Sequence, residues 1–304
     1  MMRSLYSGIS GLKNHQTRMD VIGNNIANVN TTGYKASRVI FQDIFSQTSR
    51  GGMANTGISG GTNPVQIGLG IKLSSIDVLH TPAPFARTDN PYDMMVEGDG
   101  YFIVDSPNGY FYTRAGNFKL DDEGWLTTSD GYYVMGYAGT FTYVQGDEAT
   151  ETEPAIPPSM EFNYDIDYED LSRIRLRVPG EDEGDVPIDL DGFAVGDDGS
   201  VSVIIDNEKV TIARIALAMF SNPGGLEKAG NSMYRATASS GGAVQTQAIQ
   251  NGSGKIIGGG LEMSNVDLAT EFTDMIVTQR GFQANSRIIT VSDTLLEELV
   301  NLKR

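Results

Sequence analysis

The sequence predicts an α+β multidomain protein, in which long, paired N- and C-terminal α-helices flank an antiparallel β-rich middle domain with a small acidic, β-containing insert. Three observations predict this class. Both ends carry apolar stripes at helical spacing. All 11 prolines lie between Pro64 and Pro223, so neither end holds a helix breaker. The residues between the ends form short strand-like runs separated by turn formers, as in antiparallel sheets.

An N-terminal helix is predicted over residues 3–30. Its stripe steps mostly by three and four residues and consists of Leu5, Ile9, Leu12, Gln16, Met19, Ile22 and Ile26. Gly8, Gly11 and Gly23 each weaken a helix by about 1 kcal/mol relative to alanine. Because the isolated helix would be marginal in water, we expect both ends to be disordered or frayed in the free chain and to order on assembly.

A C-terminal helix is predicted over residues 264–302, with Ser264 and Asp267 spaced as a capping box. Its stripe alternates steps of four and three: Leu268, Phe272, Met275, Gln279, Phe282, Ser286, Ile289, Asp293, Leu296 and Val300. A second apolar row widens this face and consists of Ile288, Val291, Leu295, Leu299 and Leu302. A face this wide favours contacts on several sides.

We interpret the two stripes as a polymerisation interface through which the helices pair with each other and with other copies. Ordinary packing of each helix against the protein's own core is the alternative. The polar positions in the stripes are expected to set the register of the contacts: Gln16, Gln279, Ser286 and Asp293.

Strand-like runs fill the middle of the chain at 71–79, 93–96, 101–104, 110–113, 117–120, 125–127, 132–137, 201–205 and 210–220. Turn formers separate them, and Asp206-Asn207 is the expected hairpin turn between the last two runs. We therefore predict a terminal helical domain (1–32 with 261–304), a connecting segment (33–70), a β-rich domain (71–138 with 188–240), an acidic insert (139–187) and a linker (241–260).

The charge of the chain is concentrated near the insert. The net charge is −17 at pH 7, and residues 147–198 hold 17 acidic residues against three arginines, a local net charge of −14. An acidic chain repels phosphate backbones, so we expect no nucleic-acid partner. No apolar run reaches the length of about 18 residues that a membrane-spanning helix needs, so we expect no membrane insertion. The first residues also lack a secretory h-region.

Few residues could support catalysis or cofactor binding. The chain has no cysteine, and its two histidines are His15 and His80, so thiolate sites are excluded and histidine-based zinc or triad sites lack ligands. Residues 57–61 match a hydrolase nucleophile elbow around Ser59, but they lie in a glycine-rich loop. Residues 189–192 resemble part of a calcium loop with its glycine too early. We expect no enzyme activity and no cofactor; a calcium-binding module and a secreted hydrolase are the alternatives from other classes.

Five segments carry a resemblance to a known family, the bacterial flagellar rod and hook axial proteins. Residues 19–35 (MDVIGNNIANVNTTGYK) resemble its N-terminal signature, and residues 261–268 (LEMSNVDL) and 275–285 (MIVTQRGFQAN) its C-terminal signature. Residues 98–102 (GDGYF) and 112–118 (YTRAGNF) resemble motifs of its β domain. The resemblance implies an axial structural protein of the flagellum, exported unfolded by the flagellar type III apparatus and polymerised into a hollow tube.

Within the family, the signatures and the ending at residues 298–302 look most like hook proteins. The resemblance therefore implies a flexible extracellular hook that transmits motor torque to the filament, in contact with the rod, the hook cap and the hook–filament junction. The alternative is the distal rod of the basal body, because the glycine-rich segment 46–64 is similar to an extra loop that stiffens distal rod proteins.

Overall fold

A computed structural model describes residues 2–54, 60–107, 109–144, 159–166, 170–176, 193–205 and 208–302. The chain divides into two compact units. The first, which we call the terminal unit, comprises the described parts of 1–29, 35–79 and 266–304. The second, the β unit, comprises the described parts of 30–34 and 80–265. The predicted order of helix, β-rich middle and helix is confirmed.

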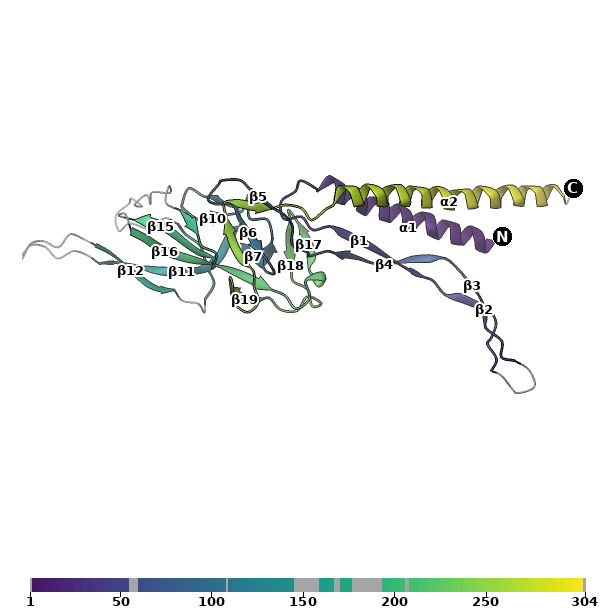
Figure 1. The fold of residues 1–304 in the computed structure, drawn as a ribbon, viewed down its shortest axis with the longest axis horizontal. Coiled ribbons are helices and arrows are strands. Elements are labelled where there is room, and N and C mark those ends of the chain that lie inside the picture. The colour runs from purple at the N-terminus through teal and green to yellow at the C-terminus, as the bar shows by residue number, and fades with distance from the viewer. Residues whose placement is uncertain are drawn as a thin grey trace, which may run out of the picture. The chain divides into compact units, whose positions relative to one another are not determined.

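Two helices run side by side in the terminal unit, α1 (Met2–Ala27) and α2 (Leu268–Asn301) (Figure 1). They are antiparallel, because Arg18 pairs with Asp274 whereas Gly8, ten residues earlier, lies against Asn285. Helix α2 begins after Asp267, whose side chain accepts a hydrogen bond from the Ala269 amide. The expected cap at Ser264 is wrong, because Asp267 itself satisfies the first free amides of the helix.

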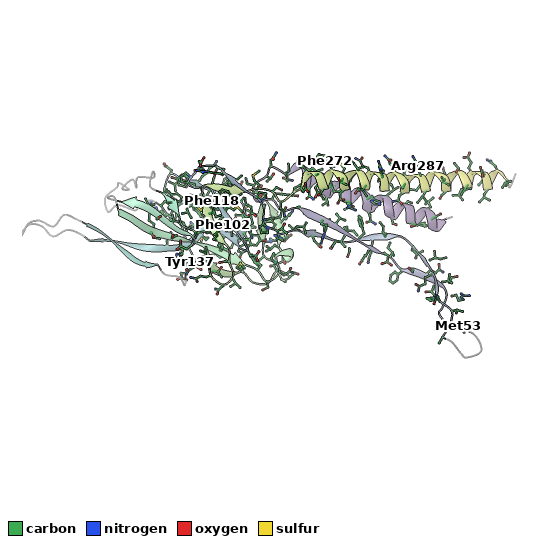
Figure 2. The ribbon with its side chains drawn as sticks, in the orientation of Figure 1. Met53, Phe102, Phe118, Tyr137, Phe272 and Arg287 are labelled. Atoms are coloured by element: carbon green, nitrogen blue, oxygen red, sulfur yellow. The ribbon has the colours of Figure 1, made fainter. Side chains whose placement is uncertain are left out.

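The terminal unit also contains a β-ribbon, of which the sequence predicted only the strand at 71–79 and assigned it to the β-rich domain. Strand β1 (Ser37–Asp43) pairs antiparallel with β4 (Ile71–Val78), and β2 (Ser46–Arg50) pairs with β3 (Val65–Gly68). Strands β1 and β4 pack on α1. The connecting segment expected at 33–70 is therefore a hairpin. Figure 2 labels Met53, which lies beyond the β2–β3 pair and bridges to Thr62.

The β unit is built on one large antiparallel sheet with the strand order β14-β15-β16-β11-β7-β8-β18-β17. Strands β9, β10, β12, β13 and β19 join its members, and β5–β21 and β6–β20 form separate pairs. Their bounds are β5 Phe85–Arg87, β6 Met94–Glu97, β7 Tyr101–Ser106, β8 Gly109–Thr113, β9 Lys119–Leu120, β10 Leu126–Thr127, β11 Tyr133–Val144, β12 Ser159–Ile166, β13 Ser172–Arg173, β14 Ala194–Val195, β15 Ser200–Ile205, β16 Glu208–Met219, β17 Glu227–Gly230, β18 Met233–Arg235, β19 Val244–Gln247, β20 Lys255–Gly258 and β21 Gly260–Glu262. A short 3₁₀ turn spans Pro223–Gly225.

Both faces of this sheet are buried at its centre. Because successive side chains of a strand point to opposite faces, Phe102 and Tyr101 of β7 enter two different apolar clusters. Leu217 and Ala216 of β16 divide in the same way. The labelled Phe102, Phe118 and Tyr137 in Figure 2 belong to these clusters. Half of the aromatic residues of 101–137 are thus buried in a packed core, namely Tyr101, Phe102, Tyr112, Phe118 and Tyr137, whereas Tyr110 is exposed.

The predicted linker and the predicted hairpin in the middle of the chain have different outcomes. The linker predicted at 241–260 is wrong, because β19 pairs with β16 and β20 pairs with β6. Glycine, serine and glutamine dominate the composition of this segment, and this favoured a linker. Short strands can nevertheless pair through backbone hydrogen bonds without many apolar side chains. Strands β15 and β16 do pair as predicted, and their turn at 206–207 lies outside the described residues. Most of the insert, with residues 57–59 and 189–192, also lies outside them.

Candidate assembly surface of the terminal helices

The surface between α1 and α2 is made mainly of polar and small residues, with Ile288 and Ile289 of α2 beside Gly8. The absence of a side chain at Gly11 lets α1 approach Asn285, since a Cβ at Gly11 would lie 2.6 Å from the nitrogen of the Asn285 side chain. Likewise, a Cβ at Gly281 of α2 would lie 2.8 Å from the His15 ring. These glycines weaken each isolated helix but make the close pairing of the two helices possible.

Polar contacts fix the register of this helix pair. The Arg18 guanidinium lies 2.8 Å from an Asp274 carboxylate oxygen. The Asn25 side chain of α1 donates to a Glu271 carboxylate oxygen at 3.0 Å. Thr278 and Ser292 of α2 are buried as well, and the Ser292 hydroxyl bonds within its own helix, to the Ile288 carbonyl oxygen at 2.7 Å. Gln16 and Gln279, which were expected to set the register, are both exposed and lie outside this buried surface. A register role for them between copies stays a prediction.

Two asparagines attach α1 to the β-ribbon. The Asn14 side-chain nitrogen donates to the carbonyl oxygens of Ser10 and Ile71, at 2.9 and 2.8 Å. The Asn25 side chain, only 1% exposed, pairs with both backbone groups of Ser37 and also donates to a Glu271 carboxylate oxygen at 3.0 Å. Burial raises the pKa of the Glu271 carboxyl, an effect that the Asn25 hydrogen bond opposes. Helix α1 is therefore held on two sides within one chain.

In contrast, much of the apolar surface of α2 is exposed. The exposed members are Leu268, Phe272, Ile276, Val277, Ile288, Val291, Leu295, Leu299, Val300 and Leu302. Figure 2 labels Phe272 and Arg287 along this helix. Val291 is 56% and Leu302 82% exposed, and such exposed apolar patches are typical of interaction surfaces rather than of a core. We call this set the outer face of α2.

The predicted interface residues occupy three kinds of position. Ile22 is 4% exposed and belongs to the subunit's own core, so its side chain is not offered to another copy. Exposed positions are Ile9, Gln16, Leu268, Phe272 and Gln279, and half-buried positions are Leu5, Leu12, Met19, Ile26, Met275, Phe282, Ile289 and Leu296. Most of the contact surface with α1 lies one residue before the predicted α2 stripe, at Glu271, Asp274, Gly281 and Asn285. Sequence periodicity missed these residues because they are polar or small. Ile289 of the stripe also lies beside Gly8 of α1.

Comparison with known proteins identifies the family. Residues 5–35 match the family model of the flagella basal body rod protein, residues 95–203 that of the flagellar hook protein FlgE/F/G D1 domain, and residues 257–302 that of the flagellar basal body rod FlgEFG protein C-terminal region. The chain belongs to the flagellar rod and hook protein family. It is a structural protein of the flagellum, located in the basal body or the hook.

Individual relatives match this family member along its whole length. The basal-body rod protein FlgG of Bacillus subtilis is 46% identical over 307 positions that cover 100% of both chains. The hook protein FlgE of Borreliella burgdorferi is 33% identical over 444 positions, again covering both chains in full. The rod protein FlgG of Caulobacter vibrioides is 31% identical over 307 positions, covering 99% of this chain and all of its own.

The sites from other classes receive no support from the described residues. No helix in the described part of the chain is long and apolar enough to cross a membrane. Among the same residues, no three His, Asp or Glu side chains gather in a way that could hold a metal ion. Three arginines could bind an anion by their charge, but Arg114 is buried in the β unit, whereas Arg280 and Arg287 are exposed on α2.

Proposed function

We propose that this chain is a self-assembling axial subunit, polymerised through its terminal helices into a hollow tube. One observation carries the proposal: within a chain of a flagellar structural family, the outer face of α2 is apolar and exposed, while its contact with α1 consists mainly of polar and small residues. Burying an exposed aliphatic side chain contributes about 1.5–3 kcal/mol, so this surface supplies a driving force for association. The partners of this proposal are other copies, other axial proteins of the flagellum and its type III export apparatus.

Within the flagellum, we infer that the subunit forms the distal rod. The relationship to FlgG supports this position, because the two chains align from end to end over 307 positions at 46% identity. The alignment with the hook protein of Borreliella burgdorferi needs 444 positions, so that hook protein carries large segments that this chain lacks. The sequence signatures favoured the hook, and the full-length match to FlgE at 33% identity keeps the hook as the second candidate.

The β-ribbon supports the rod assignment. Strands β1 and β4 pack on α1, but beyond them the ribbon exposes Phe45 (85%), Met53 and Ile67. A two-stranded ribbon is only marginally stable in water by itself. Such side chains favour packing against neighbouring copies. A ribbon clamped between copies would resist bending, which a straight shaft requires and a flexible hook does not.

Electron microscopy of flagella from cells that lack this chain separates the two positions. Basal bodies without their distal rod are expected; complete rods without a hook would assign the chain to the hook instead. Flagella of normal structure would contradict both assignments.

The role of the outer face is tested by polymerisation of the purified chain. Val291→Asp places a charge on this face and is expected to prevent tube formation, whereas Val291→Ile keeps the position apolar and should polymerise normally. Circular dichroism checks that α2 folds in both variants. Normal tubes from Val291→Asp would show that this face is not the interface.

The alternatives from other classes have separate readouts. A calcium-binding module would show a melting temperature raised by millimolar calcium through mass action, and we expect no change. A hydrolase would lose ester hydrolysis on Ser59→Ala, and we expect no hydrolysis in the unmodified chain.

A further inference from the structure

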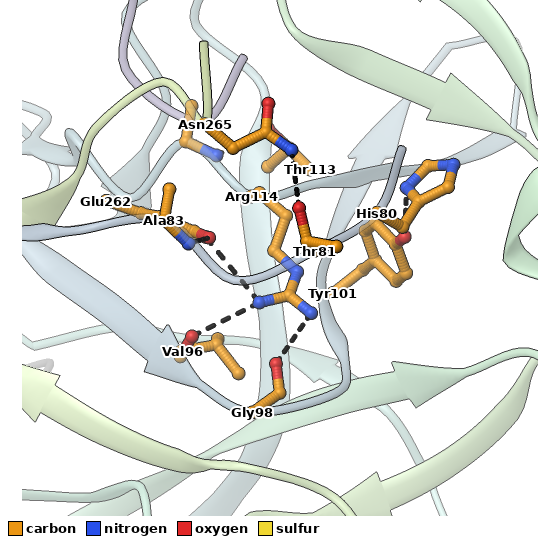
Figure 3. Close-up of polar contacts among 11 residues, drawn as sticks. His80, Thr81, Ala83, Val96, Gly98, Tyr101, Thr113, Arg114, Glu262 and Asn265 are labelled. Carbon is orange, nitrogen blue, oxygen red and sulfur yellow. Dashed lines mark hydrogen bonds and ion pairs between the residues drawn. The ribbon is translucent and has the colours of Figure 1, made fainter. Parts of the chain in front are cut away.

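The β unit contains a buried ion pair, between Arg114 and Glu262, at the centre of a polar cluster (Figure 3). The two side chains are 2% and 0% exposed, and their charged atoms lie 3.5 Å apart. The Arg114 guanidinium also donates to the carbonyl oxygens of Val96 at 3.1 Å and Gly98 at 2.7 Å. It lies over the ring of Tyr101, 5.1 Å from the centroid.

The chain passes between the two units at four points, after residues 29, 34, 79 and 265. On the β unit's side, the segments that lead to these points contact the cluster. The Gly33 amide donates to the Glu262 carbonyl oxygen at 2.8 Å, and the Ala83 amide donates to the Glu262 carboxylate at 3.2 Å. We call these four crossing points the exits of the β unit. Each exit lies within a few residues of Gly33 or Ala83, which donate hydrogen bonds to Glu262, or of Glu262 itself.

Two further bonds tie these segments together. The Asn265 side-chain nitrogen donates to the Thr81 hydroxyl at 2.8 Å, which joins two of the exits directly. The Tyr101 hydroxyl lies 2.7 Å from the His80 Nδ1. Because burial raises the pKa of Tyr101 to about 12, its hydroxyl keeps its proton at neutral pH and can donate to the ring.

Backbone packing around Arg114 is equally tight. Gly33 has a φ of +66°, and a Cβ there would lie 2.5 Å from the Ala115 amide nitrogen and 2.8 Å from the Arg114 carbonyl carbon. The turn at 30–34 is therefore pressed against the backbone that carries Arg114. Only glycine allows both the positive φ and this approach.

Stability alone does not account for this arrangement. Buried ion pairs are often replaced by apolar residues without loss of stability, because desolvating two charges offsets their attraction. The planar guanidinium does fix an arrangement of segments, since its fork of donors joins two carbonyl groups of residues 96–98 to the carboxylate of Glu262. A chain that only needed a stable β unit could use an apolar cluster here.

We propose that Arg114 and Glu262 are positioning residues that clamp the exits of the β unit in one fixed arrangement. Force transmitted along the terminal helices would then reach the β unit through segments held in a fixed geometry instead of through flexible segments. This role rests on the proposed function as an axial subunit. The clamp itself is a property of the single chain, so it is tested without assembly.

The test is hydrogen exchange in the unassembled full-length chain. In the double variant Arg114→Met/Glu262→Gln, neither charge is left unpaired, and the new glutamine side chain retains an acceptor for the Ala83 amide. Exchange at the Gly33 and Ala83 amides is expected to accelerate about tenfold through local opening, with no change in strands β7 and β16 or in the melting temperature. The matched control Arg173→Met/Asp105→Asn removes a partly exposed ion pair of the same unit and should leave both amides unchanged.

The conservative variant Arg114→Lys keeps the charge without the fork of donors, and it should also accelerate exchange at Gly33 and Ala83. Wild-type exchange at both amides in either folded variant overturns the proposal. An equal acceleration throughout β7 and β16 overturns it as well, because it shows a loss of stability alone. If the double variant does not fold, Arg114→Lys decides the question. Failure of the chain to polymerise would leave these results unaffected, so the two proposals fail separately.

Discussion

The Asn25 side chain pairs with Ser37 as a strand residue would: its amide nitrogen donates to the Ser37 carbonyl oxygen at 2.9 Å, and its oxygen accepts from the Ser37 amide at 3.0 Å. A helix residue thus completes the hydrogen bonding at the start of β1. The remaining Asn25 proton goes to Glu271 of α2, so one side chain connects three elements of the terminal unit.

We expect Asn25→Asp to destabilise the terminal unit by about 2–3 kcal/mol, because it removes two donated bonds and places a second carboxylate beside Glu271 in a buried site. Urea unfolding followed by circular dichroism measures the loss. Asn24→Asp is the control, since Asn24 is exposed and its side-chain oxygen is an acceptor that aspartate retains. Equal stability of the two variants would show that the pairing with Ser37 contributes little.

The glycines of the helices should respond in opposite directions to alanine. No atom lies within 4 Å of a Cβ at Gly23, so Gly23→Ala should stabilise α1 by about 1 kcal/mol through helix propensity. Gly281→Ala should cost about 1–3 kcal/mol instead, because the new methyl meets the His15 ring. Thermal unfolding of the two variants decides this. A gain in stability from both would mean that α1 and α2 do not pack closely.

The sequence predicts the helices and most strands well because their periodicity reflects burial. It fails where polar contacts or backbone hydrogen bonds, and not apolar burial, hold two elements together. Most of the α1–α2 contact consists of polar and small residues such as Asp274, Gly281 and Asn285, which no hydrophobic pattern marks. The outer face of α2 is apolar and exposed, so most of its stripe does not mark the partner helix, and its contact with other copies stays a proposal. Strands β2 and β3 of the ribbon and strand β19 pair through their backbones, and their largely polar side chains resemble those of loops.

The stability of the terminal unit should fall as the pH is lowered below 6.5. Burial, and secondarily the charge of Arg18, lower the pKa of His15 from 6.5. The unfolded chain then binds the proton more tightly than the folded one, so stability is highest above pH 6.5 and is lost as the pH falls towards the lowered value. Melting temperatures at about pH 7.5 and about pH 5 measure the difference. His15→Gln should reduce it, and an undiminished pH dependence in this variant would assign the effect to other groups.

The β-ribbon should matter for the polymer and hardly for the single chain. Phe45 is exposed, so Phe45→Ser is expected to change the free energy of unfolding by less than about 0.5 kcal/mol. If a neighbouring copy covers the ring in the tube, losing that burial removes about 1.5–3 kcal/mol per contact. The critical concentration for assembly should then rise about tenfold or more, as sedimentation of polymer measures. Gln42→Ser, at an exposed polar position of the same ribbon, should polymerise like the unmodified chain. A critical concentration unchanged by Phe45→Ser would place the ribbon outside the contacts between copies and would remove its support for the rod.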